Sequence, residues 1–323
     1  MEILSFSRNV KEELARHHST ARHCQIAELA AILSMSGKIC YNGQGQRQLI
    51  FQTENEVVVR KCFTLLRKTF NIETEIRIRQ HTGLNKGSVY TIDLKSVSLT
   101  RRVLEGIKAV EADKKVSDQL IEVDPIVYQK NCCKRAFVRG SFLAAGSISD
   151  PEKFYHFEIV CSTQGKAIQI QQVIASFDVD ARIVMRKKSY VVYIKEGAQI
   201  VEILGIMEAG KALMDLENIR ILKEMRNSVN RKVNCETANI HKTVNAAVKQ
   251  IDDIRLIEEK RGLGSLNPGL EQIARLRLEF PEATLKELGE MLSPTVGKSG
   301  VNHRLRKLSV LTEELRGNKE EVL

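Results

Sequence analysis

The sequence has no apolar run long enough to cross a bilayer and no secretory leader. A membrane-spanning helix needs about 20 consecutive, mostly apolar residues, and the 323 residues contain no such run. The start of the chain, from Met1 to Arg8, lacks the charged beginning, the long apolar stretch and the small-residue cleavage site of a signal peptide. We therefore expect a cytoplasmic protein without a membrane partner.

The seven cysteines are odd in number and include no CxxC pair. This pattern indicates neither a disulfide framework nor a zinc site, and reduced thiols suit the cytoplasm. Cys132 and Cys133 are adjacent. Because adjacent side chains diverge, helix packing is a better interpretation of this pair than metal ligands or a redox couple. We expect no metal and no cofactor.

Acidic residues are outnumbered by basic ones. The chain has 50 Lys and Arg against 40 Asp and Glu, a formal net charge of +10. A basic surface favours a polyanionic partner, because bound phosphates release condensed counterions. General solubility is the alternative explanation. The chain is 43% hydrophobic, and its length is enough for two or three packed domains.

The chain contains an internal duplication. Two helical stretches rich in small residues, Ile26–Gly37 and Ala136–Gly146, each end at glycine, and the spacing of these two glycines sets the offset between the copies. The same elements follow each stretch. In the first copy these are a strand at 49–53, a helix at 57–70, strands at 72–79 and 89–94, and a helix at 99–110. In the second copy they are a strand at 156–162, a helix at 167–177, strands at 181–186 and 190–194, and a helix at 200–209. In the first of these alternating strands, Ile76 and Ile78 are expected to face a core.

The predicted fold is α+β, with two α-β-β-α-β-β-α copies forming one pseudo-symmetric domain, joined to a small all-α domain. The predicted boundaries are 1–112 for the first repeat, 126–214 for the second, 215–263 for a helical linker and 264–317 for the C-terminal domain. The last boundary rests on a break rich in Gly, Pro and Asn between Arg261 and Gly269. The duplication supplies twofold symmetry within one chain, so we expect a monomer.

The C-terminal region has the pattern of a helix-turn-helix. A helix over 270–280 ends before Pro281, and Thr284 with Glu287 has the spacing of a capping box for the next helix. A short loop follows, and Ser299 is expected to cap a third helix. Two short helices, a tight connection and a capped basic helix together predict a helix-turn-helix.

The third helix has an apolar side and a basic side. Val301, Leu305 and Leu308 fall on one side at helical spacing, and no Asp or Glu occurs from Val296 to Leu308. Arg and Asn can bond base edges, and Lys and helix N-termini hold phosphates. A solvated helix face more often carries both charge signs, so the pattern favours DNA contact. The candidate DNA-binding residues are Lys298, Ser299, Asn302, His303, Arg304, Arg306 and Lys307.

The two helices that end at glycine resemble the motif of LAGLIDADG homing endonucleases, whose fold has the same element order. In that motif, small residues allow two helices to touch, and each helix end presents a carboxylate to divalent metal. Aligning the terminal glycines puts Ser36 and Ala145 at the acidic positions. Neither residue can bind Mg²⁺ as a carboxylate does, and the nearby acids Glu28 and Asp150 lie a turn or a loop away. The resemblance therefore implies lost nuclease activity.

A closer resemblance covers essentially the whole chain. The stretches that carry it are Ser5–Ser7, Val10–Leu14, Asn131–Phe142 with Gly146-Ser147, Glu236–Ile240 and Gly297–Leu308. They are similar to the WhiA family of bacterial regulators. The resemblance implies a degenerate LAGLIDADG-like domain, a helix-turn-helix similar to sigma-factor region 4, binding to double-stranded DNA at the nucleoid, and a role in sporulation or in cell division and chromosome segregation.

Three hypotheses follow. The first is a non-catalytic DNA-binding regulator, with other regulators or division proteins as further partners. The second is a metal-dependent endonuclease that uses non-standard carboxylates. The third is a division scaffold whose basic helix contacts protein. A second DNA surface on the predicted sheets is as plausible as an ordinary charged exterior; its candidate residues are Arg77, Arg79, Arg182, Arg186, Lys187 and Lys188.

Overall fold

The computed structural model describes residues 5–41, 43, 45–80, 87–111 and 120–317. The chain forms two compact units, Met1–Lys223 and Glu224–Leu323, and each is described by itself. In the described part, no helix is both long enough and apolar enough to span a membrane. The linker and helix-turn-helix boundaries expected at residues 263 and 264 stay a prediction.

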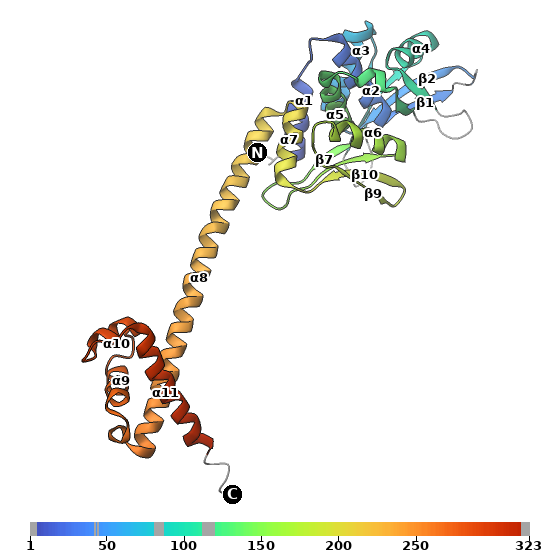
Figure 1. The fold of residues 1–323 in the computed structure, drawn as a ribbon. Helices are drawn as coiled ribbons and strands as arrows, with labels where there is room; N and C mark the ends of the chain where they lie inside the picture. The colour runs from blue at the N-terminus through green and yellow to red at the C-terminus, as the bar shows by residue number, and fades with distance from the viewer. Residues whose placement is uncertain (1–4, 42, 44, 81–86, 112–119, 318–323) are drawn as a thin grey trace. The chain divides into compact units, whose positions relative to one another are not determined.

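The first unit holds both copies of the duplication (Figure 1). A leading helix, α1 (Phe6–Arg16), precedes them. The first copy consists of α2 (Arg22–Ser36), β1 (Gly37–Tyr41), β2 (Arg47–Thr53), α3 (Glu56–Phe70), β3 (Ile76–Gln80), β4 (Ser88–Leu94) and α4 (Val97–Gly106). The second copy consists of α5 (Asn131–Ala145), β7 (Gly146–Ile148), β8 (Phe157–Cys161), α6 (Gln164–Ala175), β9 (Arg182–Arg186), β10 (Ser189–Ile194) and α7 (Gly197–Met207).

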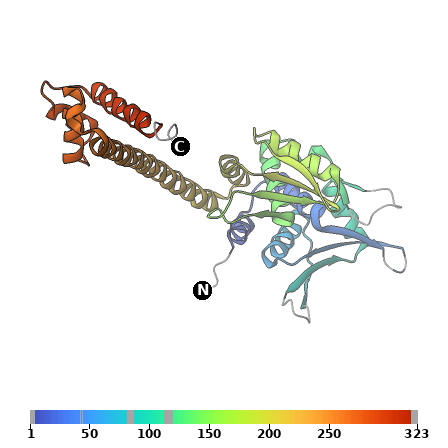
Figure 2. The same cartoon turned by 90° about the horizontal axis from the view of Figure 1, so that it is seen from below.

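The two sheets have the same topology. Their strand orders are β1-β2-β4-β3 and β7-β8-β10-β9, and neighbouring strands are antiparallel. This confirms the predicted duplication and the α-β-β-α-β-β-α order of each copy. Figure 2 shows the two sheets and the helices of the first unit from a second direction.

Two details of the first copy differ from expectation. Ile78 does not face a core: its exposed fraction is 63%. β3 is the edge strand of its sheet and pairs with β4 alone, and only its first residue, Ile76, is partly buried. The helix expected to reach residue 110 ends at Gly106, and β5 (Ala109–Glu111) then pairs with β6 (Leu120–Val123) before the short 3-10 helix η1 (Pro125–Tyr128).

Helices α2 and α5 pack against each other at very short range in the middle of the first unit. Gly140 of α5 lies against the backbone carbonyl of Glu28, and a Cβ at Gly140 would also lie 3.0 Å from the Cβ of Ala31. The spacing from Ala31 to Gly140 equals that from Gly37 to Gly146, so Ala31 and Gly140 are equivalent positions of the two copies. The small residues expected from the motif therefore face each other across the contact.

Gly37 and Gly146 follow these helices, but not for the reason that the sequence pattern indicated. A glycine after a helix usually adopts the left-handed conformation. Here Gly37 has φ −83° and Gly146 has φ −90°, and each begins a strand. A Cβ at Gly37 would overlap the carbonyl oxygen of Leu33, and one at Gly146 would overlap Phe142. Steric room, and not left-handed geometry, requires glycine at both positions.

A buried ion network spans the same helix contact. Glu28 is 0% exposed and lies 3.1 Å from both Lys61 Nζ and Arg139 Nε. Arg139 also donates to Glu208 and, at 3.1 Å, to Ser19 Oγ. The two cations balance the negative charge of Glu28. Glu28 also lies in the middle of α2, and not at the helix end, where the endonuclease motif places its metal ligands.

The second unit is built around three short helices and the end of a long one. Helix α8 (Gly210–Arg261) leads into it, followed by the 3-10 helix η2 (Leu263–Ser265), α9 (Pro268–Glu279), α10 (Leu285–Met291) and α11 (Lys298–Gly317). Ile254 and Ile257 of α8 share a core with Ile273, Leu288 and the apolar side of α11. Thr312 of α11 donates to the carbonyl of Asp253 at 3.2 Å, so α11 lies along the end of α8, as both ribbon views show (Figures 1 and 2).

Replacing Gly140 with alanine is predicted to destabilise the first unit. The new methyl group has to push α2 and α5 apart, and inserting a methyl into a packed interior typically costs about 1–3 kcal/mol. Calorimetric melting of the full chain measures the effect as a lower midpoint for the first unit. Gly210→Ala is the matched control, because no atom lies within 4 Å of a Cβ there. Equal midpoints for the two variants would contradict the close packing.

Candidate nucleic-acid interface

The connection before the basic helix is held by local hydrogen bonds. The capping box is confirmed: Glu287 N donates to Thr284 Oγ1 at 3.3 Å, and Thr284 N donates to Glu287 Oε2 at 2.7 Å. After α10 the chain turns back so closely that Val296 N donates to Gly289 O at 3.0 Å. A Cβ at Gly289 would overlap the Val296 carbonyl. Gly289 thus permits the tight turn between α10 and α11.

Arg277 supports the site structurally, and the sequence pattern did not single it out. Its side chain is buried, and Nη1 donates to the carbonyls of Ala283 at 2.7 Å and Pro281 at 3.3 Å. Burial lowers the pKa of this guanidinium from its ordinary value. Arg277 fixes the turn that leads into α10. From the sequence alone, a single arginine in an amphipathic helix that bonds a turn cannot be distinguished from one that is exposed to solvent.

The apolar side of α11 is buried as expected. Val301, Leu305 and Leu308 are at most 2% exposed and pack in the core of the second unit. These contacts fix which side of α11 faces outward.

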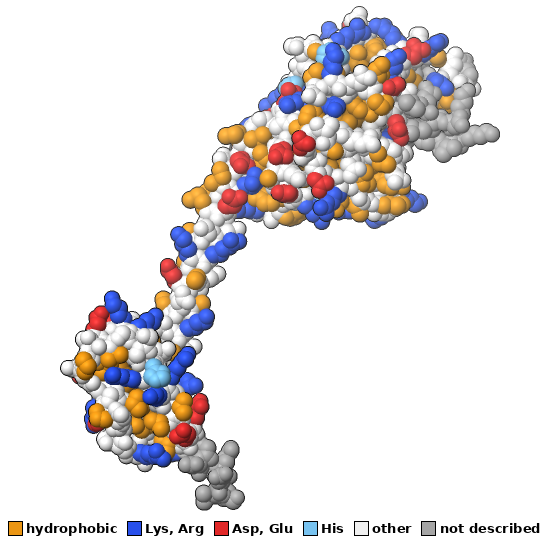
Figure 3. All heavy atoms as spheres, in the orientation of Figure 1, with side chains coloured by type: hydrophobic (Ala, Val, Ile, Leu, Met, Phe, Trp, Pro, Cys, Tyr) orange, Lys and Arg blue, Asp and Glu red, His pale blue; other side chains and the backbone are white. Residues whose placement is uncertain are grey.

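Four of the candidate DNA-binding residues form the outward side of α11: Ser299, His303, Arg306 and Lys307 are all exposed. Lys298, at the first position of the helix, is also exposed. Lys and Arg side chains gather on the visible face of the second unit, with few acidic ones among them (Figure 3). The arrangement presents an exposed polar ridge with three cations, Lys298, Arg306 and Lys307, beside a helix N-terminus, which suits a phosphate backbone.

Asn302 and Arg304 lie at the two flanks of that ridge and are half-buried. Arg304 Nη1 donates to Gly269 O at 3.4 Å, so this side chain braces α11 against the start of α9. Asn302 and Lys298 border a cavity of about 940 Å³ between α8, α10 and α11. The candidate residues thus fall into two groups: those that are exposed on the outward side of α11, and the half-buried Asn302 and Arg304 at its flanks.

Ser299 does not cap α11. The helix begins at Lys298, and Gly297 O accepts from Val301 N at 3.1 Å, so Ser299 lies inside the first turn. The expected cap is wrong by two positions, because Gly297 occupies the N-cap position, where glycine is also favoured. Ser299 is exposed in the first turn of α11.

Ser36 and Ala145 lie at the last positions of α2 and α5. Ser36 and Ala144 border an open cleft of about 790 Å³, which is also lined by the cationic residues Arg8, Lys11 and Lys38. Burial lowers the pKa of Lys11 to about 8. Two acidic residues of the same cleft, Glu54 and Glu56, are exposed.

A further lysine lies at the end of α2. Lys166 is 1% exposed, and its Nζ donates to Ser34 O at 2.7 Å and to Ser162 Oγ at 3.2 Å. Burial lowers its pKa to about 8. A cationic side chain at this end of the helix pair opposes the binding of a divalent cation.

The basic residues suggested for a second surface lie on the sheets of the first unit. Arg77 is 3.6 Å from Asp93, Arg182 is 3.6 Å from Asp180, and Arg186 is 3.3 Å from Glu158. These three are exposed, as are the remaining candidates, Arg79, Lys187 and Lys188. Carboxylates therefore accompany half of the set, which favours an ordinary charged exterior for those positions.

Three family models match successive parts of the chain. The WhiA N-terminal LAGLIDADG-like domain matches residues 22–108, the WhiA LAGLIDADG-like domain matches 134–226, and the WhiA C-terminal HTH domain matches 229–312. A protein of Lachnoclostridium phytofermentans named "Probable cell division protein WhiA" is 54% identical over 97% of this chain and 100% of that protein. The chain belongs to the WhiA family. A protein of the same name from Alkaliphilus oremlandii is 47% identical over 98% of this chain and 99% of its own length.

The fold has also been seen in a crystal. The crystal structure of full-length DUF199/WhiA from "Thermatoga maritima" superposes with a TM-score of 0.58 at 24% identity, over 96% of this chain and 99% of that one. At this identity the likeness shows the fold alone. It confirms the predicted α+β class, and the family models identify the two LAGLIDADG-like domains and the helix-turn-helix domain.

Lys166 is predicted to make the stability of the first unit rise with pH above neutrality. Between about pH 8 and 10.5 the unfolded chain binds more protons at this lysine than the folded chain does, so linkage raises the free energy of unfolding, by about 3 kcal/mol at most. Lys11 adds to this rise, whereas buried cysteines such as Cys24 and Cys161, whose pKa values are raised by burial to about 12, oppose it above about pH 9. Urea unfolding at pH 7.5 and 9.5 therefore compares variants: the change in the free energy of unfolding is expected to be less positive in Lys166→Met than in the wild type, and unchanged in the control Lys188→Met, which alters an exposed lysine. An unchanged rise in Lys166→Met would refute the assignment.

Proposed function

We propose that this WhiA family member is a non-catalytic DNA-binding regulator that acts in cell division and chromosome segregation, as a monomer associated with the nucleoid. The observation that carries the proposal is the outward side of α11, which is cationic, exposed and free of acidic residues from Val296 to Leu308. The match to an HTH family model supports DNA as the partner. The names of the relatives support the role in cell division.

The structure suggests distinct roles for the proposed DNA-binding residues. Arg306 and Lys307 reach outward with Ser299 and His303, so we assign these four to direct contact with the duplex. Lys298 lies at the helix N-terminus, where a phosphate is favoured by both the lysine charge and the helix dipole. Asn302 reaches the duplex from the flank. Arg304 is bonded to Gly269 O and positions the helix.

The double variant Arg306→Ala/Lys307→Ala tests the DNA-reading helix. Each lost phosphate contact removes roughly one unit from the slope of log affinity against log salt, so we expect a slope smaller by about two and weaker binding to all sequences. Fluorescence anisotropy with labelled duplexes at several salt concentrations measures this.

Arg60→Ala/Arg101→Ala is the matched control, because it removes the same net charge from exposed arginines of α3 and α4. If both double variants keep the wild-type affinity and slope, α11 is not the reader, and a protein partner becomes the better explanation of its basic side.

A metal-dependent endonuclease is the second candidate function. One observation favours it: Glu54 and Glu56 line the cleft at the end of α2. The cationic residues of that cleft oppose it, and the helix ends themselves carry Ser36 and Ala145.

Incubation with Mg²⁺ and supercoiled plasmid separates the two functions. We expect no cutting by the wild-type chain. Metal-dependent cutting that is lost in Glu54→Gln/Glu56→Gln would establish the nuclease and overturn the non-catalytic proposal. The double variant Glu152→Gln/Glu196→Gln, outside the residues that line the cleft, controls for the loss of acidic charge.

A further inference from the structure

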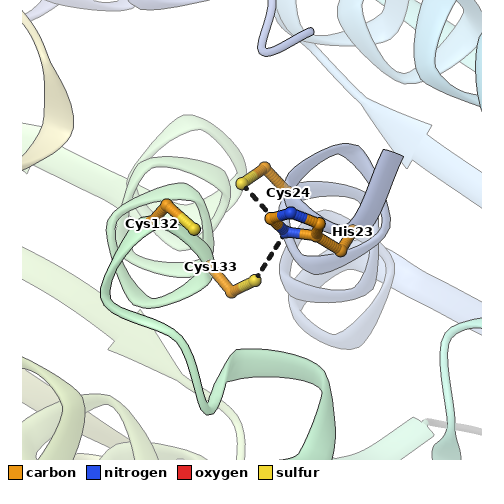
Figure 4. Close-up of side chains that lie close together, drawn as sticks. All are labelled: His23, Cys24, Cys132 and Cys133. Carbon is orange, nitrogen blue, oxygen red and sulfur yellow. Dashed lines mark hydrogen bonds between the residues drawn. The ribbon is translucent and has the colours of Figure 1, made fainter. Parts of the chain in front are cut away.

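Four metal-binding side chains meet where α2 and α5 begin. His23 and Cys24 lie in the first turn of α2, and Cys132 and Cys133 lie in the first turn of α5. One ligand atom from each residue falls within 4.8 Å of the others. Figure 4 shows the imidazole and the three thiols pointing toward one another from the two helices. No CxxC pair signalled this cluster, because each copy supplies an adjacent pair and the two pairs meet only in the fold.

The two pairs occupy equivalent positions of the duplication. Cys132 corresponds to His23 and Cys133 corresponds to Cys24 under the same offset that relates the ends of the two helices. Each copy therefore contributes the same two helix positions to the cluster. Rise along an α-helix is about 1.5 Å per residue, so the cluster is roughly 20 Å from Ser36, at the opposite end of α2 from the endonuclease-type cleft.

The distances are close to those of a tetrahedral site. His23 Nδ1 lies 3.1 Å from Cys133 Sγ and 3.3 Å from Cys24 Sγ. Bond lengths of about 2.3 Å to sulfur and 2.0 Å to nitrogen imply ligand separations of about 3.8 Å between sulfurs and 3.5 Å from nitrogen to sulfur. The two nitrogen–sulfur distances in the structure are thus slightly shorter than those of a tetrahedral zinc site, and all four ligand atoms lie within 4.8 Å of one another.

The N-terminal ends of two uncapped helices face the cluster. The N-cap residues of α2 and α5, Ala21 and Lys130, form no side-chain cap, whereas α3 and α6 are capped by Asn55 and Thr163. Uncapped N–H groups and the positive end of a helix stabilise a nearby thiolate. Cys24 and Cys133 are 5% and 3% exposed, in a small apolar cluster with Ala27 and Ala136, so water is largely excluded from them.

We propose that His23, Cys24, Cys132 and Cys133 bind one zinc ion, which joins the N-terminal ends of the two LAGLIDADG-like helices. Three thiolates and one imidazole form a donor set that structural zinc sites use, and soft ligands disfavour Mg²⁺ and Ca²⁺. The ion links the two copies, and with four protein ligands it has no open position for catalysis. This replaces the sequence-based expectation of packing residues and no metal.

Zinc binding at this site has to release thiol protons. Metal binding to protonated thiols displaces those protons, so the apparent affinity for zinc increases steeply with pH. This pH dependence separates thiolate ligation from weak binding at surface carboxylates.

Metal analysis of the tag-free, full-length chain tests the proposal. The protein is purified with a phosphine reductant and without chelator, and its zinc is measured by mass spectrometry. We expect about one zinc per chain, a lower melting midpoint of the first unit after chelation, and restoration by added zinc. Cobalt substituted for zinc is expected to show the visible bands of a tetrahedral site and a thiolate charge-transfer band in the near ultraviolet.

Cys132→Ser is the decisive variant, because Cys132 is exposed and its replacement opens no cavity. Its matched control is Cys235→Ser, which alters the other exposed cysteine of the described residues. We expect Cys132→Ser to lose about a third of the charge-transfer intensity and to bind zinc at least tenfold more weakly, with Cys235→Ser unchanged. His23→Ala and Cys133→Ser should weaken zinc binding further.

Three results would overturn the proposal. The first is less than about 0.1 zinc per chain together with no cobalt spectrum in the reduced protein. The second is a cobalt spectrum that is the same in Cys132→Ser and in the wild type. The third is a disulfide between Cys24 and either cysteine of α5 that forms without reductant and is the sole source of stabilisation, which would make the cluster a redox pair.

Discussion

The close approach of α2 to α5 is the constraint on which the first unit depends. Gly140 allows the backbone of one helix to rest on the carbonyl of Glu28 in the other. Dispersion attraction falls steeply with distance, so a helix pair at this separation gains contacts that bulkier residues would prevent. The two sheets follow directly from the ends of this pair, at Gly37 and Gly146, and their placement is therefore set by it.

The two ends of the helix pair differ in chemistry. At the C-terminal ends, lysine side chains occupy a region where the endonuclease motif has carboxylates, and Lys166 donates to a free helix carbonyl at Ser34. Cations suit the negative end of a helix dipole. At the N-terminal ends, thiols and an imidazole face the positive end. Thiolates held by a zinc ion would be favoured by that end of the dipole.

Much of this architecture could be predicted from the sequence. The duplication, the helix-turn-helix, the capping box at Thr284 and the buried side of α11 all arise from local periodicity or from a self-similar order of elements. The errors arose where three-dimensional neighbours decide. The exposure of Ile78 depends on its edge position, and the bracing role of Arg304 depends on the carbonyl of Gly269. The cluster of His23 with three cysteines was hidden for the same reason, since its halves belong to different copies and lie far apart along the chain. The start of α11 is the exception, because it depends on Gly297, two residues before Ser299 along the chain.

The ion pair between Glu28 and Arg139 makes the two copies unequal. Under the offset that relates Gly37 to Gly146, the counterpart of Glu28 is Phe137 and the counterpart of Arg139 is Ala30. Two first copies brought together would leave each buried Glu28 with Lys61 as its cationic partner, and two second copies would leave each Arg139 with Glu208 as its acidic partner. Removing one partner from a buried charge is unfavourable. The network is therefore complete only when a first copy pairs with a second.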